Sequence, residues 1–120
     1  MKLFLILFLC LMSSVFFAQD TISAGQTTDF IDKIVLVKGK VASFRAAKDG
    51  KNTNYLNIDK PYPNAEFTVV LSNNYLLEKS IKIEDFDQKN ICVYGKITIY
   101  KNDPKKVPQM FNPDKIIILK

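Results

Sequence analysis

The chain has 120 residues, enough for one domain with a single hydrophobic core. Its formal net charge is +5, from 17 lysine and arginine against 12 aspartate and glutamate residues, a bias that permits polyanion binding without requiring it. The absence of histidine excludes imidazole acid–base catalysis and histidine metal ligation.

The beginning of the chain has the layout of a secretory signal peptide. A short cationic start, Met1-Lys2, precedes an almost wholly apolar stretch over residues 3–12. The sequence turns polar at Gln19. This order of cationic, apolar and polar segments is typical of an export signal.

We expect cleavage after Ala18, which gives a signal peptide at 1–18 and a domain at 19–120. A retained anchor is the alternative, because Phe16 stands where a small residue is preferred. The apolar run is, however, shorter than the ~20 residues of a membrane-spanning helix. Cleavage leaves Cys92 as a lone cysteine, which we expect to be a small buried apolar residue without a disulfide.

The mature chain is expected to begin with a short helix and a long strand. Ser23 and Gln26 fit a capping box, which predicts a helix as far as about Ile31. Lys33–Arg45 reads as a strand, and Gly39 within it predicts a bulge. Val35, Val37 and Val41 are expected on one face of this strand, with Leu36, Lys38 and Lys40 on the other face up to the glycine.

Two further strands follow. Lys48–Lys51 contains Asp-Gly and predicts a hairpin turn, because this pair tolerates positive φ values. Asn54–Asp59 and Glu66–Ser72 alternate as strands, and the proline-rich Lys60–Asn64 connects them. The alternation places Tyr55, Asn57 and Asp59 outward. In the next strand it separates one face, with Phe67, Val69 and Leu71, from the other, with Thr68, Val70 and Ser72.

The last third of the chain reads as a helix and two strands. Asn73-Asn74 predicts the cap of a short helix that ends near Ser80. Asn90–Tyr100 is expected to be one strand, followed by a basic loop at Lys101–Val107. The closing strand is expected in two pieces, over Pro108–Phe111 and Ile116–Leu119.

A short pattern occurs twice and suggests the architecture. Residues 35–41 and 91–97 share branched residues followed by Gly-Lys and another branched residue. Two bent strands favour a barrel, in which Gly39 and Gly95 are expected to lie near each other. We therefore predict an all-β fold with a short helix, a five-stranded OB-fold Greek-key barrel, since a β-sandwich usually needs about seven strands.

Three segments also carry a resemblance. At Tyr55-Leu56-Asn57-Ile58, Tyr62-Pro63-Asn64 and Phe67-Thr68-Val69-Val70, the chain resembles exported bacterial OB-fold domains of the nucleic-acid-binding type. Such domains stand alone after signal peptides or are attached to secreted nucleases. The resemblance runs from Ile22 to Asn112-Pro113-Asp114 and implies an OB barrel. The departures from it lie in the segments Lys82–Gln88 and Lys101–Val107.

An OB barrel binds ligands along its second and third strands, between two loops that are both basic here. Positive grooves and aromatic platforms bind single-stranded nucleic acid, and Tyr94 and Tyr100 are further platform candidates. The alternative is ordinary surface chemistry, with solvated lysines and tyrosines that pack the barrel edges. The candidate ligand-binding residues are Arg45, Lys48, Lys51, Tyr55, Asn57, Tyr62, Lys101, Lys105 and Lys106.

We expect an exported, periplasmic or secreted, non-catalytic module that binds single-stranded nucleic acid or another polyanion weakly and without sequence preference. The alternative is a periplasmic or cell-surface module for an envelope protein, a glycan or a small ligand. The single arginine, Arg45, cannot build a nuclease site of the staphylococcal type, which needs two. We expect no cofactor and no metal, because Glu84, Asp85 and Asp87 lack calcium-loop spacing.

Overall fold

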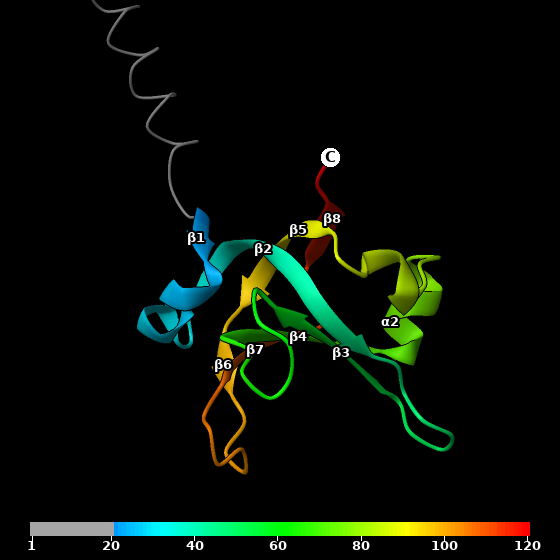
Figure 1. The fold of residues 1–120 in the computed structure, drawn as a ribbon, viewed down its shortest axis with the longest axis horizontal. Helices are drawn as coiled ribbons and strands as arrows, with labels where there is room; N and C mark the ends of the chain where they lie inside the picture. Colours follow the sequence, from blue (N-terminus) through cyan, green and yellow to red (C-terminus); the bar gives the residue numbers. More distant parts are fainter. Residues whose placement is uncertain (1–20) are drawn as a thin grey trace, which may run out of the picture.

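The computed structural model describes residues 21–120, so the leader expected at 1–18 lies outside the described residues. Among residues 21–120, no helix is long and apolar enough to span a membrane. The elements in chain order (Figure 1) are β1 (Thr21–Ser23), 3-10 helix η1 (Ala24–Phe30), β2 (Ile34–Arg45), β3 (Thr53–Ile58), β4 (Phe67–Ser72), α2 (Asn73–Glu78), 3-10 helix η2 (Ile83–Phe86), β5 (Asn90–Lys96), β6 (Thr98–Ile99), β7 (Pro108–Phe111) and β8 (Lys115–Ile118).

The strands curl into a barrel that the closing segment completes. Hydrogen-bonded neighbours follow the order β6-β7-β4-β3-β2-β5-β8, and β1 pairs separately with β2. β7 pairs in parallel with β4, while β8 pairs antiparallel with β5. Residues 112–114 join β7 directly to β8. The part of the sheet that ends in β4 and β7 therefore lies close to the part that ends in β5 and β8. The predicted fold class, an all-β barrel with a short helix, is confirmed.

Strand β2 belongs to both halves of the barrel, and Figure 1 shows it as one long curved ribbon. Its first part pairs with β5 and its second part with β3. Gly39 lies at this corner, where a Cβ would collide with Cγ2 of the buried Ile58. The predicted bulge at Gly39 is wrong, because the pairing runs unbroken through it and shifts between Val41 and Ser43.

The two glycines of the repeated pattern are not neighbours, contrary to the prediction. β2 and β5 run antiparallel, so Gly39 pairs with Ile91 and Gly95 pairs with Val35. The two positions are therefore four residues apart along the ladder, roughly 13 Å. Gly95 allows a different close approach, since a Cβ there would lie 3.1 Å from Sδ of Met110.

The strand predicted over residues 90–100 is broken at Ile97. Ile97 N donates to Lys33 O at 3.0 Å, and Ile97 O accepts from Asp32 N at 2.7 Å. These bonds turn the chain, and β6 leaves β5 to pair with β7 instead. The break therefore directs Tyr100 and the loop after it toward β4 and β7.

Helix α2 follows β4 directly and contacts the turn between β7 and β8. Ser72, rather than Asn73 or Asn74, caps it by accepting a hydrogen bond from Tyr75 N at 3.1 Å. Tyr75 O–H donates to Pro113 O at 2.7 Å. Burial raises the pKa of Tyr75 to about 12, and the Asp114 carboxylate adds to the effect.

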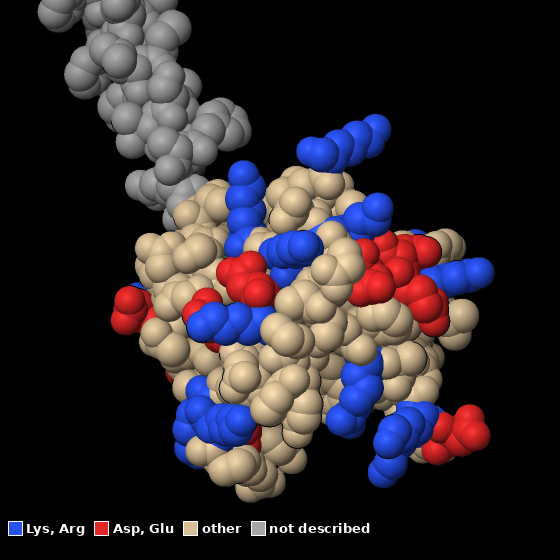
Figure 2. Space-filling view, in the orientation of Figure 1, with Lys and Arg blue, Asp and Glu red and all other residues tan. Residues whose placement is uncertain are grey.

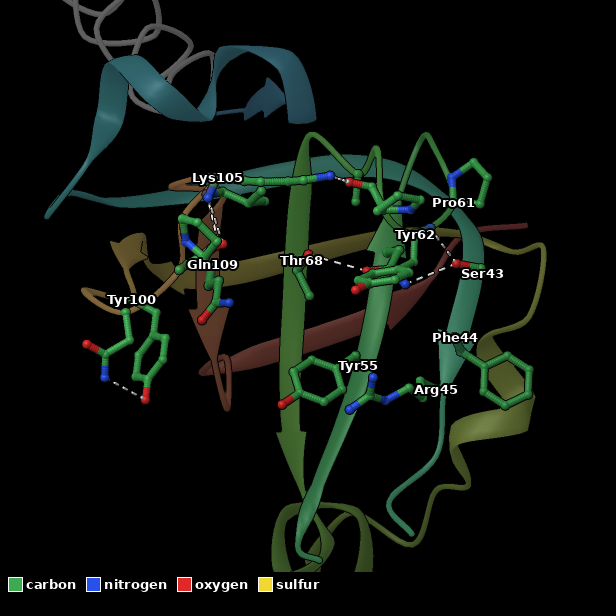
Figure 3. A pocket seen from close by; sticks show the side chains of 17 residues that line it. Ser43, Phe44, Arg45, Tyr55, Pro61, Tyr62, Thr68, Tyr100, Lys105 and Gln109 are labelled. Atoms are coloured by element: carbon green, nitrogen blue, oxygen red, sulfur yellow. Dashed lines mark hydrogen bonds between the residues drawn. The ribbon is translucent and has the colours of Figure 1, made fainter.

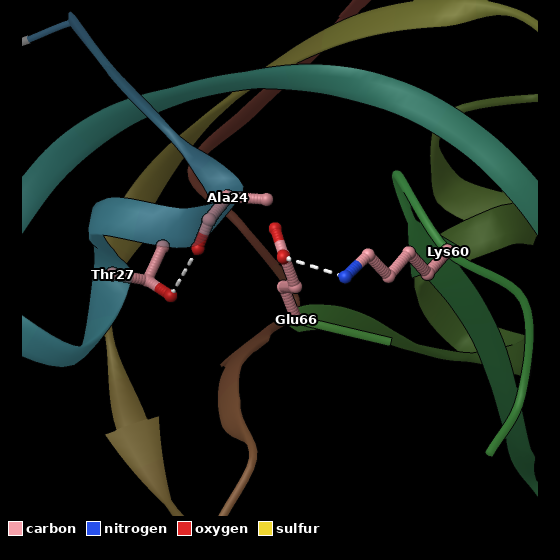
Figure 4. Close-up of polar contacts among 4 residues, drawn as sticks. All are labelled: Ala24, Thr27, Lys60 and Glu66. Atoms are coloured by element: carbon pink, nitrogen blue, oxygen red, sulfur yellow. Dashed lines mark hydrogen bonds and ion pairs between the residues drawn. The ribbon is translucent and has the colours of Figure 1, made fainter. Parts of the chain in front are cut away.

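The segment before β2 packs against the loop between β3 and β4. Ser23 and Gln26 form the predicted capping box, but the helix that follows is 3-10 rather than α. A Cβ on Gly25 would lie 3.3 Å from Oε2 of Glu66, so the glycine makes room for this carboxylate. Glu66 also pairs with Lys60 at 3.3 Å (Figure 4). Both contacts position the base of the loop between β3 and β4.

The core fills the inside of the barrel. Cys92 is buried, as expected, and burial raises the pKa of its thiol while the Lys38 charge partly opposes the rise. The largest fully buried side chains are Phe67, Phe86, Leu56, Ile58, Leu71, Ile91, Ile97, Met110, Val37, Val41, Val69 and Val93.

Candidate ligand-binding cleft

A row of polar side chains crosses the outer face of four neighbouring strands. Ser43 on β2 is opposite Asn57 on β3, and Asn57 is opposite Thr68 on β4. Thr68 in turn is opposite Gln109 on β7. We call these four residues the polar row, which spans about 14 Å at the usual strand spacing.

Hydrogen bonds connect three members of the polar row, as the dashed lines in Figure 3 show. Thr68 Oγ1 donates to Asn57 Oδ1 at 3.4 Å, and Asn57 Nδ2 donates to Ser43 Oγ at 3.0 Å. Tyr62 N also donates to Ser43 Oγ, at 3.4 Å. Asn57 is only 6% exposed, so its amide positions the hydroxyls on either side of it.

A second row lies beside the first, one outward position further along each strand. Arg45 is opposite Tyr55, Tyr55 is opposite Val70, and Val70 is opposite Phe111. We call these four residues the aromatic row. The Arg45 guanidinium carbon lies 5.0 Å from the Tyr55 ring centroid, a cation–π contact. Phe111 is 60% exposed and extends the apolar surface.

Two loops flank the polar row and, with Arg45 and Tyr55 of the aromatic row, form a cleft of about 630 Å³. The β3–β4 loop (residues 59–66) presents Tyr62, and the β6–β7 loop (residues 100–107) presents Tyr100. Both rings are largely exposed, at 75% and 58%. Lys105 Nζ donates to Pro63 O at 3.1 Å, so one hydrogen bond connects the two loops across the cleft (Figure 3).

Asp103 organises the β6–β7 loop. Its Oδ1 accepts from Lys105 N and its Oδ2 accepts from Val107 N, both at 3.0 Å. The carboxylate therefore stabilises the loop, while it also reduces the positive charge on this side of the cleft.

The structure brings together five of the nine predicted ligand-binding residues. The five that line the cleft are Arg45, Tyr55, Asn57, Tyr62 and Lys105. The other four lie outside its lining: Lys48 and Lys51 at the β2–β3 hairpin, and Lys101 and Lys106 in the β6–β7 loop. Lys106 Nζ instead donates to Lys101 O at 2.9 Å.

Of the two further platform candidates, Tyr100 lines the cleft and Tyr94 does not. Tyr94 lies on β5, opposite Leu36 and Lys115 in the other half of the barrel. The lining residues that sequence reasoning did not select include Ser43, Thr68 and Gln109.

The lysines do not gather into one continuous patch on the face shown in Figure 2. Blue side chains are spread over that face, and carboxylates lie between them. Among residues 21–120 the one ion pair is Lys60–Glu66. No group of three or more potential metal ligands occurs in this part of the chain. The charged residues in the lining of the cleft itself are Arg45, Lys105 and Asp103.

Comparisons with solved structures identify the architecture. OBody AM3L15, bound to hen egg-white lysozyme, matches with a TM-score of 0.61 and 14% identity over 85% of this chain and 95% of its own. OBody AM2EP06, also bound to hen egg-white lysozyme, matches with a TM-score of 0.59 and 16% identity, over 85% and 94%. The chain has the OB-fold.

The same fold occurs as part of a larger enzyme. A protein assigned as an aspartyl-tRNA synthetase from Leishmania major Friedlin matches with a TM-score of 0.58 and 12% identity. The match covers 82% of this chain but 20% of the synthetase, so this chain corresponds to about a fifth of that protein's length. No family model and no curated protein matches the sequence, so the similarity is one of fold.

Proposed function

We propose that this chain is an exported, non-catalytic OB-fold module that binds single-stranded nucleic acid in the cleft between the β3–β4 and β6–β7 loops. The observation that carries the proposal is the arrangement of tyrosines around that cleft. Tyr55 lies in the floor under Arg45, while Tyr62 and Tyr100 project from the two loops. Bases stack on such platforms whatever their identity, since every base has a π-face.

The few cations of the cleft set the expected strength of binding. Arg45 and Lys105 are the cations in its lining, and Asp103 lies beside them. Each phosphate contact with a single strand contributes a log–log salt slope of about −0.7, so two contacts predict about −1.4. We therefore expect dissociation constants in the range of about 10 to 100 µM at low salt.

Two further features support the wider proposal. The matched synthetase is named for a tRNA substrate, which accords with a nucleic-acid ligand for this chain. Export rests on the cationic and apolar start of the sequence, and the periplasm or the exterior is the proposed location. The non-catalytic role rests on the absence of histidine and on a single arginine.

A second candidate function is binding of an uncharged ligand such as a glycan at the cell surface or in the periplasm. The observation that favours it is that both cleft cations already have internal partners. Arg45 lies over Tyr55, and Lys105 donates to Pro63 O. Tyrosines and amides without free charge would suit a sugar ring as well as a base.

Fluorescence anisotropy with a labelled 15-residue single-stranded oligonucleotide separates these functions. The chain purified after export is titrated at low and at moderate salt. Binding within the expected range and a slope near −1.4 supports the first function. Absence of binding at 100 µM protein in low salt contradicts it, and binding of a neutral oligosaccharide with no salt dependence establishes the second.

A further inference from the structure

The polar row contains a hydroxyl whose hydrogen has no protein acceptor. Ser43 Oγ accepts from Asn57 Nδ2 and from Tyr62 N. A serine hydroxyl has two lone pairs and one hydrogen, so both lone pairs are already in use. Within residues 21–120 Ser43 Oγ donates to no acceptor, and the residue lines the cleft.

The donor does not depend on which way the amide is turned. In the arrangement described, each hydrogen bond points from Thr68 through Asn57 to Ser43. Turning the Asn57 amide would reverse these bonds and free the hydroxyl hydrogen of Thr68 instead, which also lines the cleft. Either way, the chain of bonds ends in a hydroxyl donor at the cleft.

A second donor lies next to the first. Asn57 Nδ2 carries two hydrogens, and one of them is used on Ser43. Ser43 and Asn57 are paired across β2 and β3, and both residues line the cleft. Hydrogen bonds in a connected chain also polarise one another, which strengthens the donor at its end.

We infer that the Ser43 end of the cleft selects bases with an exocyclic carbonyl oxygen, so that thymine or uracil binds in preference to adenine. A carbonyl oxygen can accept from both donors through its two lone pairs. Adenine carries an amino donor where thymine carries its O4 acceptor, and each of its ring nitrogens has one lone pair, so adenine leaves at least one of the two donors unsatisfied. This inference rests on the proposed function and adds a base preference to stacking that is otherwise sequence-tolerant.

The effect of removing the Ser43 hydroxyl separates this inference from simple stacking. Stacking strength and backbone flexibility give modest preferences of their own, including one for pyrimidine runs, and these do not depend on the Ser43 hydroxyl. Hydrogen-bond selection at Ser43 favours thymine. One satisfied against one unsatisfied polar contact predicts about a tenfold difference in affinity.

The experiment compares 15-residue oligo-dT and oligo-dA by fluorescence anisotropy at low salt. Wild type is expected to bind oligo-dT about tenfold more tightly. Ser43→Ala should bring the ratio close to one, mainly by weakening oligo-dT, and Ser43→Thr should retain the ratio because it keeps a hydroxyl. Thr28→Val, which removes an exposed hydroxyl in η1 outside the cleft lining, serves as the matched control. Thermal unfolding establishes that each variant is folded.

The outcomes distinguish this inference from the proposed function. Tighter binding of oligo-dA by wild type, or a dT to dA ratio that Ser43→Ala leaves unchanged, overturns the inference while the proposed function stands. Failure of wild type to bind either oligonucleotide at 100 µM overturns both. A wild-type preference for oligo-dA overturns the inference even where Ser43→Ala does not fold.

Discussion

Arg45 lies over the ring of Tyr55, with the guanidinium carbon 5.0 Å from the ring centroid. The two residues are register partners on β2 and β3, so the contact is built into the pairing of the strands. A guanidinium over one face of a ring is attracted by the ring quadrupole, and this attraction restricts the movement of the ring. Tyr55 is thereby held as a fixed platform at the centre of the aromatic row.

Loss of this platform should weaken ligand binding more than loss of another tyrosine. We expect Tyr55→Ala to reduce affinity for single-stranded DNA by about tenfold, because a base–aromatic stack contributes about 1–3 kcal/mol. Tyr94→Ala removes a tyrosine from the other half of the barrel and should change affinity less than twofold. Fluorescence anisotropy measures both, and equal losses would contradict the placement of the cleft.

The contact between Lys105 and Pro63 O places one lysine at the cleft, so we expect removal of this lysine to weaken ligand binding more than removal of a lysine elsewhere. Lys105→Ala should weaken binding about threefold, since it removes a cleft cation and the hydrogen bond between the two loops. Lys115→Ala removes the same charge from β8 and should have little effect. The salt slope should become shallower by about 0.7 in Lys105→Ala only. Identical slopes in both variants would show that this lysine does not contact the ligand.

The side chain of Ile58 lies close to Gly39, so we expect Gly39→Ala and Gly95→Ala to differ in stability. Gly39→Ala should cost about 1–3 kcal/mol, because the new Cβ meets the stiff, buried side chain of Ile58. Gly95→Ala should cost less, since Met110 Sδ at 3.1 Å belongs to a flexible side chain. Thermal unfolding tests this order, and a larger loss in Gly95→Ala would contradict it.

The raised pKa of Tyr75 predicts a loss of stability in strong alkali. Its folded pKa of about 12 exceeds the ordinary tyrosine value of 10.0, so the neutral phenol is favoured in the fold. The stabilisation is complete below pH 10 and is lost as pH rises through 12. A shift of this size corresponds to about 2–3 kcal/mol.

Tyr75→Phe isolates this effect from the titration of lysines. At pH 8 the variant should be less stable by about 1 kcal/mol, because Pro113 O loses its hydrogen bond. Between pH 10 and pH 12 wild type should lose stability that the variant retains. Denaturant unfolding at several pH values measures both proteins, and curves that stay parallel would exclude the assigned role of Tyr75.

Alternation along single strands predicted much of the fold and part of the cleft. The outward positions of Tyr55 and Asn57 followed from period-two patterning, and the strand order indicated a barrel. Ser43 was not selected from the sequence, and its position opposite Asn57 depends on a register shift that lies after Val41 rather than at Gly39. The position of a bulge depends on the partner strand, which a single sequence does not specify.

The contribution of β7 and the roles of the loop lysines depend on long-range packing. Gln109 joins the polar row through parallel pairing with Thr68, across a separation of about forty residues. Lys105 lines the cleft while Lys106 bonds within its own loop, although the two are adjacent in sequence. Composition identifies a basic loop but does not indicate which of its cations faces a ligand.

The most direct test of the proposed ligand site is a titration of the isotopically labelled chain with oligo-dT, followed by two-dimensional amide NMR. We expect chemical-shift changes to be concentrated along the polar and aromatic rows, at Ser43, Tyr55, Thr68 and Gln109, and in the β3–β4 and β6–β7 loops. Shifts centred instead on β5 and β8, or no shifts at 100 µM oligonucleotide, would contradict it.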